Sequence, residues 1–371
     1  MKIALITQYL EGHGGTERVI TELLNHDLNN TYLVLVPHSG DHPEWLQWIK
    51  RTTGQQVKIC STVTKNKQLE FITQNLLTYQ PDIVLGLEGK ANRLAAKIRQ
   101  QYHLNYQIVS WGHTSIKETD FFSQDDLQFP DYHLAISSGI EKQLQELGVP
   151  AAKIFLIYNP VTIECQPIIP IPPKNQPFHP VFIGRMILDG QKNIRLLFDS
   201  LKLLQIPWRL DMFGKGYDLA KVKHYAQKLN IAEKITWHGW LPDPWEKIRQ
   251  ADALLLSSNY EGFPMVLVEA ISRGLPVIST NCPTGPQDII NQKNGILTPM
   301  NDATAFANAC TWLYLNRFAY NHQQVQQTIK MFDVRNYIRH LQEIYCYVTG
   351  KTQKLTFNFT QNNTLEQTRT D

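Results

Sequence analysis

The sequence lacks the features by which several classes of protein are recognised. No apolar run approaches the ~18 residues that a membrane-spanning helix needs. Residues 1–30 do not combine a basic start with an apolar core, so no signal peptide is expected. The 5 cysteines lie far apart without a C-x-x-C pair, which favours reduced thiols over a disulfide framework or a zinc site. These absences predict a protein of the cytoplasm.

Several ligand-binding motifs are also missing. The sequence has no G-x-x-x-x-G-K-[ST] phosphate loop, no G-x-S-x-G and no H-E-x-x-H, and Gly12-His13-Gly14 lacks the third glycine of a dinucleotide fingerprint. It has no D-x-D pair to hold a divalent metal beside a diphosphate. We therefore expect no metal ion, so that protein groups and helix dipoles would neutralise any diphosphate.

Length and charge narrow the class of protein further. At 371 residues, with 43% hydrophobic and 19% charged residues, the chain is typical of a globular protein of two domains. The net charge of +3 is uneven, because residues 1–163 are slightly acidic and residues 164–371 slightly basic. This mild asymmetry favours a small anionic ligand in the second half over a nucleic acid, which usually needs a dense basic face.

Short β-rich runs alternate with amphipathic helices along the chain. The predicted strands are Lys2–Thr7, Tyr32–Val36, Asp82–Leu87, Gln107–Trp111, Tyr132–Ile136, Val181–Ile183, Arg209–Phe213, Ile235–Trp237, Ala253–Ser257 and Val277–Ser279. The predicted helices are Thr16–Leu28, Leu69–Tyr79, Asn92–Tyr102, Ser137 or Ser138 to Leu147, Asn193–Leu204, Asp218–Leu229, Trp245–Gln250, Pro264–Arg273 and Ala303–Leu315. Strands separated by helices predict parallel sheets that are covered on both faces.

A dense series of prolines in residues 164–180 interrupts this alternation, since prolines at that density fit neither a helix nor a central strand. The simplest interpretation is an α/β protein with two Rossmann-like domains, at residues 1–163 and 181–330, joined by a linker at 164–180. Residues 351–371 are polar and lack periodicity, which indicates a tail outside both domains.

The segment Gly12-His13-Gly14-Gly15-Thr16-Glu17 is the first candidate for ligand binding. It follows the first predicted strand and begins the first helix, where glycines allow close backbone approach and free amides can bind an anion. An ordinary tight turn explains this segment equally well when it is taken alone.

Arg185 and Lys192 are the second candidate. They follow a predicted strand and precede a helix, and a guanidinium with an ammonium group suits a diphosphate. The alternative is two solvated cations. We expect the removal of Lys192 to have little effect on folding, because an exposed cation seldom contributes much to stability.

The third and most specific candidate is Ser257-Ser258-Asn259-Tyr260-Glu261-Gly262-Phe263-Pro264-Met265-Val266-Leu267-Val268-Glu269-Ala270. Pro264 suits a helix start, where free amides can bind phosphate. Glu261 and Glu269 are unusual beside a phosphate unless they accept hydrogen bonds from sugar or ribose hydroxyls. The alternative is a helix with ordinary surface glutamates.

These segments together resemble the retaining glycosyltransferases of family 4, whose architecture is GT-B, two Rossmann-like domains that face each other across a cleft. Glu261 and Glu269 match the E-x7-E pair within E-G-F-P-M-x-L-x-E-A, and the resemblance covers about residues 1–345. The stretches F-I-G-R-x-x-L-D-G-Q-K-N, W-x-G-W and C-x-x-G-P-x-D-I-I are also similar to those of bacterial lipopolysaccharide 1,6-galactosyltransferases. Related enzymes of capsule, exopolysaccharide and teichoic-acid glycosylation share much of this pattern.

The resemblance implies a role for each matching residue. A UDP-linked sugar would bind mainly the C-terminal domain, where Arg185 and Lys192 hold the diphosphate. Glu269 would accept hydrogen bonds from the ribose, and Glu261 would contact the hydroxyls of the donor sugar. The other implied donor contacts are the amides near Gly262, Phe263 and Met265, the loops at Gly214 and Trp240 near the base, and Gly14 and Gly15 across the cleft.

His113, in W-G-H-T, would lie beside the donor sugar, although a lone histidine is more often structural. A helix at about Val334–Val348, within residues 331–350, would cross back to the N-terminal domain. The implied reaction moves galactose, glucose or GlcNAc to a hydroxyl of a glycan or lipid-linked glycan in the biosynthesis of bacterial surface polysaccharide. Its stereochemistry is retaining, it needs no cofactor besides the UDP-sugar substrate, and the departing phosphate takes the acceptor proton.

Other interpretations stay open at this point. A non-catalytic GT-B partner or glycan-binding subunit would be favoured by the loss of Arg185, Lys192 or Glu261, but all three are present. The E-G-F-P-M…E form favours transfer over a nucleotide-sugar epimerase. A basic helix with Lys90, Arg93, Lys97 and Arg99 could touch anionic lipid at the inner face of the membrane, or it could be an ordinary solvated helix packed on the sheet.

Overall fold

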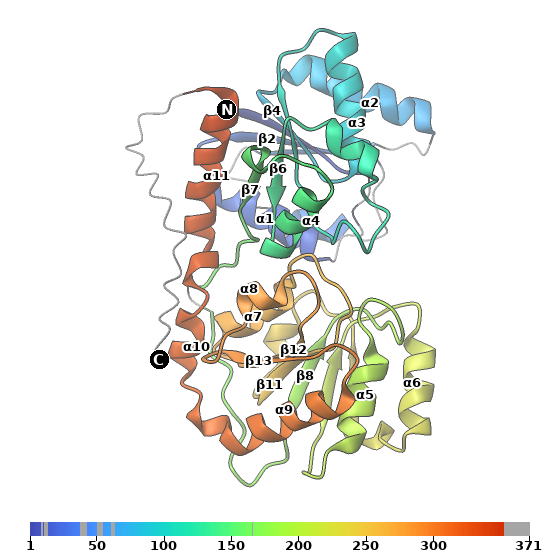
Figure 1. Ribbon diagram of the computed structural model, residues 1–371, viewed down its shortest axis with the longest axis vertical. Helices are drawn as coiled ribbons and strands as arrows, with labels where there is room; N and C mark the ends of the chain where they lie inside the picture. The colour runs from blue at the N-terminus through green and yellow to red at the C-terminus, as the bar shows by residue number, and fades with distance from the viewer. Residues whose placement is uncertain are drawn as a thin grey trace.

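The computed structural model describes residues 1–8, 10, 14–37, 43–49, 55–60, 64–164 and 166–351. Two parallel β-sheets, one above the other in Figure 1, form the centres of two Rossmann-like domains. This confirms the fold class that the alternation of strands and helices predicts. The exact domain limits remain a prediction.

The first sheet contains seven strands in the described residues, in the order β3-β2-β1-β4-β5-β6-β7. The strands are β1 Lys2–Ile6, β2 Thr31–Val36, β3 Gln56–Ile59, β4 Ile83–Gly86, β5 Gln107–Ser110, β6 Tyr132–Ala135 and β7 Ile154–Leu156. The helices are α1 Gly15–His26, α2 Lys65–Tyr79, α3 Gly89–Gln101 and α4 Ser138–Glu146, with short 3-10 turns η1 Pro43–Trp48, η3 Gln124–Gln128 and η4 Ala151–Lys153.

The second sheet has the order β10-β9-β8-β11-β12-β13. The strands are β8 Pro180–Ile183, β9 Leu210–Phe213, β10 Ile235–Gly239, β11 Ala253–Leu256, β12 Val277–Thr280 and β13 Gly295–Thr298. The helices are α5 Ile194–Leu203, α6 Leu219–Lys228, α7 Met265–Ser272, α8 Pro286–Ile289, α9 Ala303–Asn316 and α10 His322–Gln327, with 3-10 turns η5 Ala232–Lys234, η6 Pro244–Lys247, η7 Arg317–Ala319 and η8 Lys330–Phe332.

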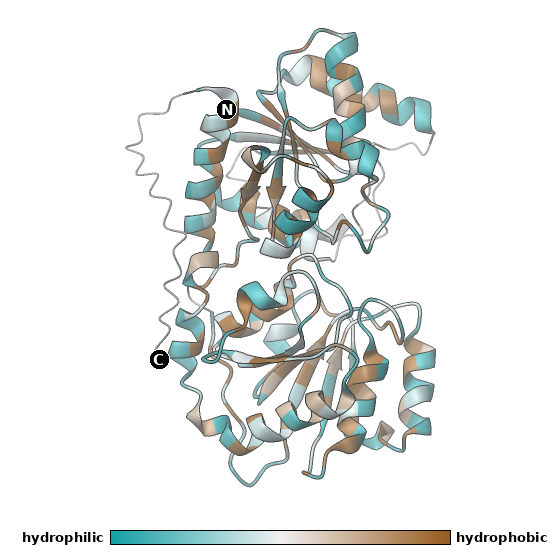
Figure 2. Cartoon of the chain, viewed as in Figure 1, coloured by the Kyte–Doolittle hydropathy of each residue, from teal (hydrophilic) through white to brown (hydrophobic). Residues whose placement is uncertain are grey.

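Each sheet has an apolar core on both faces because successive side chains of a strand point to opposite sides. In β1, Ile3 and Leu5 belong to the core shared with α1, whereas Ala4 and Ile6 belong to the core beneath α2 and α3. Figure 2 shows hydrophobic residues concentrated on the strands and the inward helix faces, with hydrophilic residues outside. Near-continuous apolar runs such as β2 are therefore what a doubly covered parallel sheet requires.

The last helix, α11 Val334–Thr349, leaves the second domain and lies along α1 of the first (Figure 1). A buried polar network anchors it there. The Asp27 carboxylate accepts hydrogen bonds from the Tyr32 hydroxyl at 2.6 Å and from the Gln342 side-chain amide of α11 at 3.2 Å. Both oxygens of the buried Asp27 carboxylate therefore accept hydrogen bonds, so this charge stabilises the packing of α11 on the first domain.

The prediction from the sequence lacks several short elements that the structure contains. β3, β7, β13 and α8 have no counterpart in the sequence-based prediction, and the helix expected at Trp245–Gln250 is instead the 3-10 turn η6. Pro264 lies at the N-cap of α7, one residue before the helix that it was expected to begin. The tail from residue 352 lies outside the described residues.

The basic helix is α3, and two of its cations are already paired. Arg93 forms an ion pair with Asp126, and Arg99 forms one with Asp131. These pairs favour the alternative of a helix packed against the protein over a basic face for lipid. No helix of the described chain is long and apolar enough to span a membrane.

The carboxyl ends of β8, β9 and β10 approach each other closely. Gly214, just after β9, has φ +132°, and a Cβ atom placed on it would lie 1.9 Å from the carbonyl oxygen of Gly184 after β8. Its amide donates a 2.7 Å hydrogen bond to the carbonyl of Gly239. Only glycine fits both the backbone angle and the space.

We predict that Gly214→Ala lowers the free energy of unfolding much more than Gly239→Ala. Gly239 also has a positive φ of +71°, but nothing lies within 4 Å of an added Cβ there. The control should therefore lose only the ~1 kcal/mol of a strained backbone angle. Urea unfolding of both variants measures the difference, and equal losses would mean that the contact with Gly184 is unimportant.

Candidate active site

The candidate active site lies where the carboxyl ends of the two sheets face each other, which is where open parallel sheets usually bind ligands. A Cβ atom placed on Gly15, at the start of α1, would lie 3.4 Å from Cγ of Met265 at the start of α7. A Cβ atom on Gly262 would lie 2.5 Å from the carbonyl oxygen of His113. The loops expected to surround the donor sugar are therefore in direct contact across the two domains.

Lys192 and Glu261 form a buried ion pair beside this contact. Nζ of Lys192 lies 2.6 Å from Oε1 of Glu261, and the two side chains are only 12% and 8% exposed. The Ser258 hydroxyl donates a 2.6 Å hydrogen bond to the same carboxylate oxygen. The expectation that Lys192 is an exposed cation is therefore wrong, because the fold places a carboxylate against its ammonium group.

Two neighbouring loops hold this ion pair in place. They follow β8 and β11, which are adjacent in the sheet, so residues far apart in the sequence meet at one edge. The amide of Asn259 donates to the Gln191 carbonyl at 2.8 Å, and its side chain donates to the Gly190 carbonyl at 2.7 Å. Asn193, the N-cap of α5 with φ 43°, donates to Oδ1 of Asn259 at 3.0 Å. The loop geometry thus fixes where the two charges lie.

Arg185 lies beside the same loop but in a different environment. Its side chain is exposed, and its guanidinium donates a hydrogen bond to the side-chain oxygen of Gln191, the residue before Lys192. The structure therefore brings the two expected phosphate-binding cations to one loop, with Lys192 buried and Arg185 at the surface.

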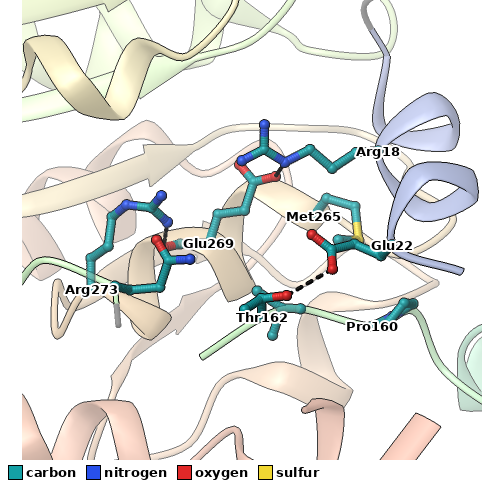
Figure 3. Close-up of a pocket in the computed structure, with 9 residues that line it drawn as sticks. Arg18, Glu22, Pro160, Thr162, Met265, Glu269 and Arg273 are labelled. Carbon is teal, nitrogen blue, oxygen red and sulfur yellow. Dashed lines mark hydrogen bonds and ion pairs between the residues drawn. The ribbon is translucent and has the colours of Figure 1, made fainter. Parts of the chain in front are cut away.

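Glu269 lies on α7 and faces the first domain. Its Oε1 lies 3.4 Å from Nε of Arg18 on α1, and its Oε2 accepts a 3.0 Å hydrogen bond from the indole nitrogen of Trp245. Attraction to Glu269 raises the pKa of the Arg18 guanidinium, although burial opposes that shift. Figure 3 shows Arg18 reaching from its helix toward Glu269 across the pocket. The carboxylate expected to bind ribose is thus an interdomain contact in this structure.

The pocket beside Glu269 is formed by both domains and the segment between them. Its lining residues are Arg18, Glu22, Pro160, Val161, Thr162, Gln166, Met265, Glu269 and Arg273. Thr162 donates a 2.7 Å hydrogen bond to Glu22, and the Arg273 guanidinium donates one of 3.0 Å to the backbone carbonyl of Glu269 (Figure 3). Burial lowers the pKa of Arg273, whose guanidinium also lies 4.8 Å from the centre of the Trp245 ring.

Sequence reasoning missed Arg18, Trp245 and Arg273. Arg18 and Trp245 reach Glu269 from separate elements, α1 and η6. No spacing within one segment signals such contacts. Only the E-x7-E pattern pointed to Glu269 itself.

The two ring nitrogens of His113 are buried but have no hydrogen-bond partner among the described residues. Neither Nδ1 nor Nε2 is paired, and its ring packs edge-on against Trp111 with centroids 4.5 Å apart. Burial lowers the pKa of His113 to about 3, so the imidazole is neutral near pH 7. An unpaired neutral imidazole at the domain contact can exchange hydrogen bonds with a hydroxyl group.

The other expected donor-binding residues lie around this centre. The amide of Gly14 donates to Oε2 of Glu17 at 3.0 Å, and Nζ of Lys215 lies 5.4 Å from the centre of the Trp240 ring near Gly214. The ring of Phe263 packs against Tyr158 and Phe332, at 6.0 and 5.3 Å between centroids. Gly12 and His13 lie outside the described residues.

This fold and this arrangement of loops belong to a known class. Residues 171–331 match the family described as glycosyl transferases group 1. The chain belongs to this family, because it is also 32% identical over 353 residues to the lipopolysaccharide 1,6-galactosyltransferase of Escherichia coli K12. That alignment covers 93% of this chain and 98% of the relative. The family resemblance drawn from the sequence is confirmed.

Other relatives and solved structures agree with this assignment. The chain is 33% identical over 343 residues to the lipopolysaccharide 1,6-galactosyltransferase of Salmonella typhimurium, covering 90% of this chain and 95% of that one. The apo structure of the lipopolysaccharide outer core galactosyltransferase WaaB superposes with a TM-score of 0.78 at 31% identity, covering 92% and 98% of the two chains. Anabaena HepE in complex with UDP has the same fold, with a TM-score of 0.77 at 18% identity, covering 94% and 100%.

We predict that Lys192→Met lowers the free energy of unfolding by about 3 kcal/mol, because it leaves the Glu261 carboxylate buried without its counter-ion. The double variant Lys192→Met/Glu261→Gln should recover most of this loss. Lys221→Met is the matched control, since Lys221 forms a 2.7 Å ion pair with Asp218 but its side chain is 72% exposed. Urea unfolding of the variants decides the matter. A double variant no more stable than Lys192→Met would mean that the lysine contributes through packing and not through its charge.

Proposed function

We propose that this protein transfers a hexose from a UDP-hexose to a hydroxyl of a bacterial surface glycan, with retention of the anomeric configuration and without a metal ion. Membership of the group 1 glycosyl transferases makes it a glycosyltransferase. The relatives that span most of its length are named as lipopolysaccharide 1,6-galactosyltransferases, which favours UDP-galactose as donor and a lipopolysaccharide core saccharide as acceptor. A further relative is named as an amylovoran biosynthesis glycosyltransferase of Erwinia amylovora.

The observation that carries this proposal is the pair Lys192–Glu261 at the contact between the domains. In the free protein these two charges neutralise each other. A bound donor offers both of them a better-placed partner, since a phosphate oxygen can take the ammonium group and a sugar hydroxyl can donate to the carboxylate. A buried pair of opposite charges at this position therefore suits a ligand that carries both an anion and hydroxyl groups.

Glu269 suits the nucleotide half of the same donor. Glu269 lies on α7, the helix whose first amides are proposed to bind the diphosphate, and its side chain lines the pocket between the domains. A ribose hydroxyl that donates to Glu269 would replace the contact with Arg18 or Trp245. HepE, which shares the fold, has been crystallised with UDP and with UDP-glucose.

The proposed mechanism follows from the charges that develop during the reaction. The bond between the sugar C1 and the phosphate oxygen breaks, so the diphosphate becomes more negative and the sugar becomes more positive. Lys192, Arg185 and the amides before α7 stabilise the leaving diphosphate. The acceptor oxygen attacks C1 from the same face, and its proton passes to the departing phosphate oxygen. Contact between His113 and Gly262 across the domains excludes water from this step.

A non-catalytic partner or glycan-binding subunit is the alternative. Such a protein would not need a lysine whose ammonium group is enclosed against a carboxylate. Nor would it need this pair beside a helix start that can bind phosphate. The buried pair therefore favours an enzyme.

The direct test is a donor panel scored by UDP release. Purified protein is incubated with UDP-galactose, UDP-glucose or UDP-GlcNAc, with and without a lipopolysaccharide core oligosaccharide that lacks galactose. We expect UDP-galactose to react and the oligosaccharide to raise the rate. Addition of EDTA should leave the rate unchanged, and loss of activity that Mg²⁺ or Mn²⁺ restores would contradict the proposed neutralisation by Lys192 and Arg185.

We predict that Glu269→Gln weakens the binding of UDP alone by ~10-fold to 100-fold, the scale of one lost hydrogen bond to a charged group. Glu261→Gln should not weaken UDP binding, because it removes the carboxylate that competes for Lys192, whereas transfer should fall steeply because that carboxylate faces the sugar. Glu22→Gln is the control, since Glu22 lines the same pocket but accepts from Thr162. Isothermal titration with UDP measures all three. If Glu261→Gln loses UDP binding and Glu269→Gln keeps it, the two roles are reversed.

A further inference from the structure

Glu88 is a carboxylate that the proposed donor site does not use. It directly precedes α3, but its side chain does not cap that helix. The carboxylate instead turns toward the end of β1, where it accepts hydrogen bonds from the Thr7 hydroxyl at 2.7 Å and from the Gln8 amide at 3.1 Å. Among the described residues, no ion pair involves Glu88.

The register of the first sheet places Glu88 at the carboxyl end of the strands, the end that faces the loop with Glu261 and Gly262. Gly86 in β4 pairs with Ile6 in β1 and with Ser110 in β5. Glu88 lies two residues beyond Gly86, where its carboxylate meets the Gln8 amide beyond β1. On the other side of β4, the chain that continues from β5 leads to His113.

The loops on both sides of Glu88 contact the second domain. Gly15, the first residue of the helix α1 that follows β1, lies against Met265, and His113, after β5, lies against Gly262. β4 lies between β1 and β5 in the sheet. Glu88, two residues beyond β4, therefore lies at the same end of the sheet, between the two segments that contact Gly262 and Met265.

A second, independent feature of this edge is the unpaired imidazole of His113. Both of its nitrogens are buried without a partner, and the indole nitrogen of the neighbouring Trp111 is also unpaired. Buried polar atoms of this kind are rare in folded proteins and usually indicate a missing partner. The edge thus combines a carboxylate acceptor with polar groups that lack hydrogen bonds, which is what a hydroxyl-rich saccharide can supply.

We propose that Glu88, held by Thr7, accepts a hydrogen bond from the attacking hydroxyl of the acceptor saccharide and orients it toward the donor sugar beside His113. The assignment rests on the proposed glycosyltransferase function. Glu88 orients the hydroxyl but does not keep its proton, which still passes to the leaving phosphate as the new bond to C1 forms. The residue therefore acts on the acceptor and not on the donor.

The charge state of Glu88 supports a pH-dependent role. Burial raises the pKa of Glu88 to about 7, although the hydrogen bonds from Thr7 and Gln8 oppose this shift. The other titratable groups around it are His113 after β5, whose pKa burial lowers to about 3, Asp126 of η3, which is paired with Arg93, and the exposed Lys90 of α3. The low pKa values of His113 and Asp126 keep both groups from titrating near pH 7. The acceptor should consequently bind better as pH rises through 7 and Glu88 ionises.

The test compares Glu88→Gln, Thr7→Val and a control, Asp82→Asn, with the wild type. Asp82 precedes β4 at the amino end of the strands, opposite to Glu88, and accepts a 2.8 Å hydrogen bond from the Lys2 amide. Three quantities are measured: affinity for UDP, release of UDP from UDP-galactose without acceptor, and kcat/KM for a galactose-free lipopolysaccharide core oligosaccharide at saturating donor.

We expect Glu88→Gln to lower kcat/KM for the oligosaccharide by ~10-fold to 100-fold, as for the loss of one charge-assisted hydrogen bond. UDP affinity and acceptor-free UDP release should stay near the wild-type values. The rise of kcat/KM with pH near 7 should disappear in Glu88→Gln, and Thr7→Val should give a smaller loss of the same kind. Asp82→Asn should behave like the wild type.

Two results would overturn the proposal. Equal losses in transfer, UDP affinity and acceptor-free release would mean that Glu88 acts through the donor site or the fold, and unchanged transfer would mean that the acceptor does not touch it. Failure of the proposed function itself has a different signature, because the wild type would then neither bind UDP nor release it from any donor.

Discussion

The close approach of Gly262 to the backbone of His113 is the constraint on which the rest of the site depends. A side chain on Gly262 would overlap the carbonyl of His113, so this glycine alone lets the two domains meet at that point. Its neighbour Glu261 is consequently shielded from solvent, and the ion pair with Lys192 lies in a medium of lower polarity than water. Charges there interact more strongly with each other and with any ligand than they would at a surface.

The same contact explains why α11 must return to the first domain. Two small domains that meet through glycine loops and a few polar side chains would move freely with respect to each other. The network of Asp27, Tyr32 and Gln342 attaches α11 to the first domain, while Phe332, just before α11, packs against Phe263, two residues after Glu261. The returning chain therefore links the first domain with the loop that carries Glu261.

The sequence predicted the fold class and the strand–helix alternation because these depend on local patterns. Ser137 caps α4 and Asn193 caps α5, as residues of their types do at helix starts, and the apolar runs of β1 and β2 need no partner to be recognised. The short strands β3 and β13 were missed because neither is a continuous buried apolar run. No residue of β3 is buried, and the two central residues of β13 are only partly buried. Within the candidate site, the glycines and glutamates stood out through their spacing.

Pairing between distant elements left no such local signal. The sequence could not show that Lys192 is buried against Glu261, since that contact joins two loops that meet only when β8 and β11 lie side by side. Nor could it show that Glu88 turns away from the helix that it precedes and bonds with Thr7. Both facts follow from strand order, which the alternation of strands and helices does not specify.

The pairing of charges in the free protein also bears on how a donor would bind. Lys192 is neutralised by Glu261, and Glu269 is neutralised by Arg18. A ligand that takes one member of each pair gains its interaction but also breaks an existing one, so its net affinity is smaller than the contacts alone suggest. An anion without hydroxyl groups would leave Glu261 buried and unpaired, whereas a sugar without a phosphate would do the same to Lys192. The arrangement therefore favours ligands that present an anionic group and hydroxyl groups together.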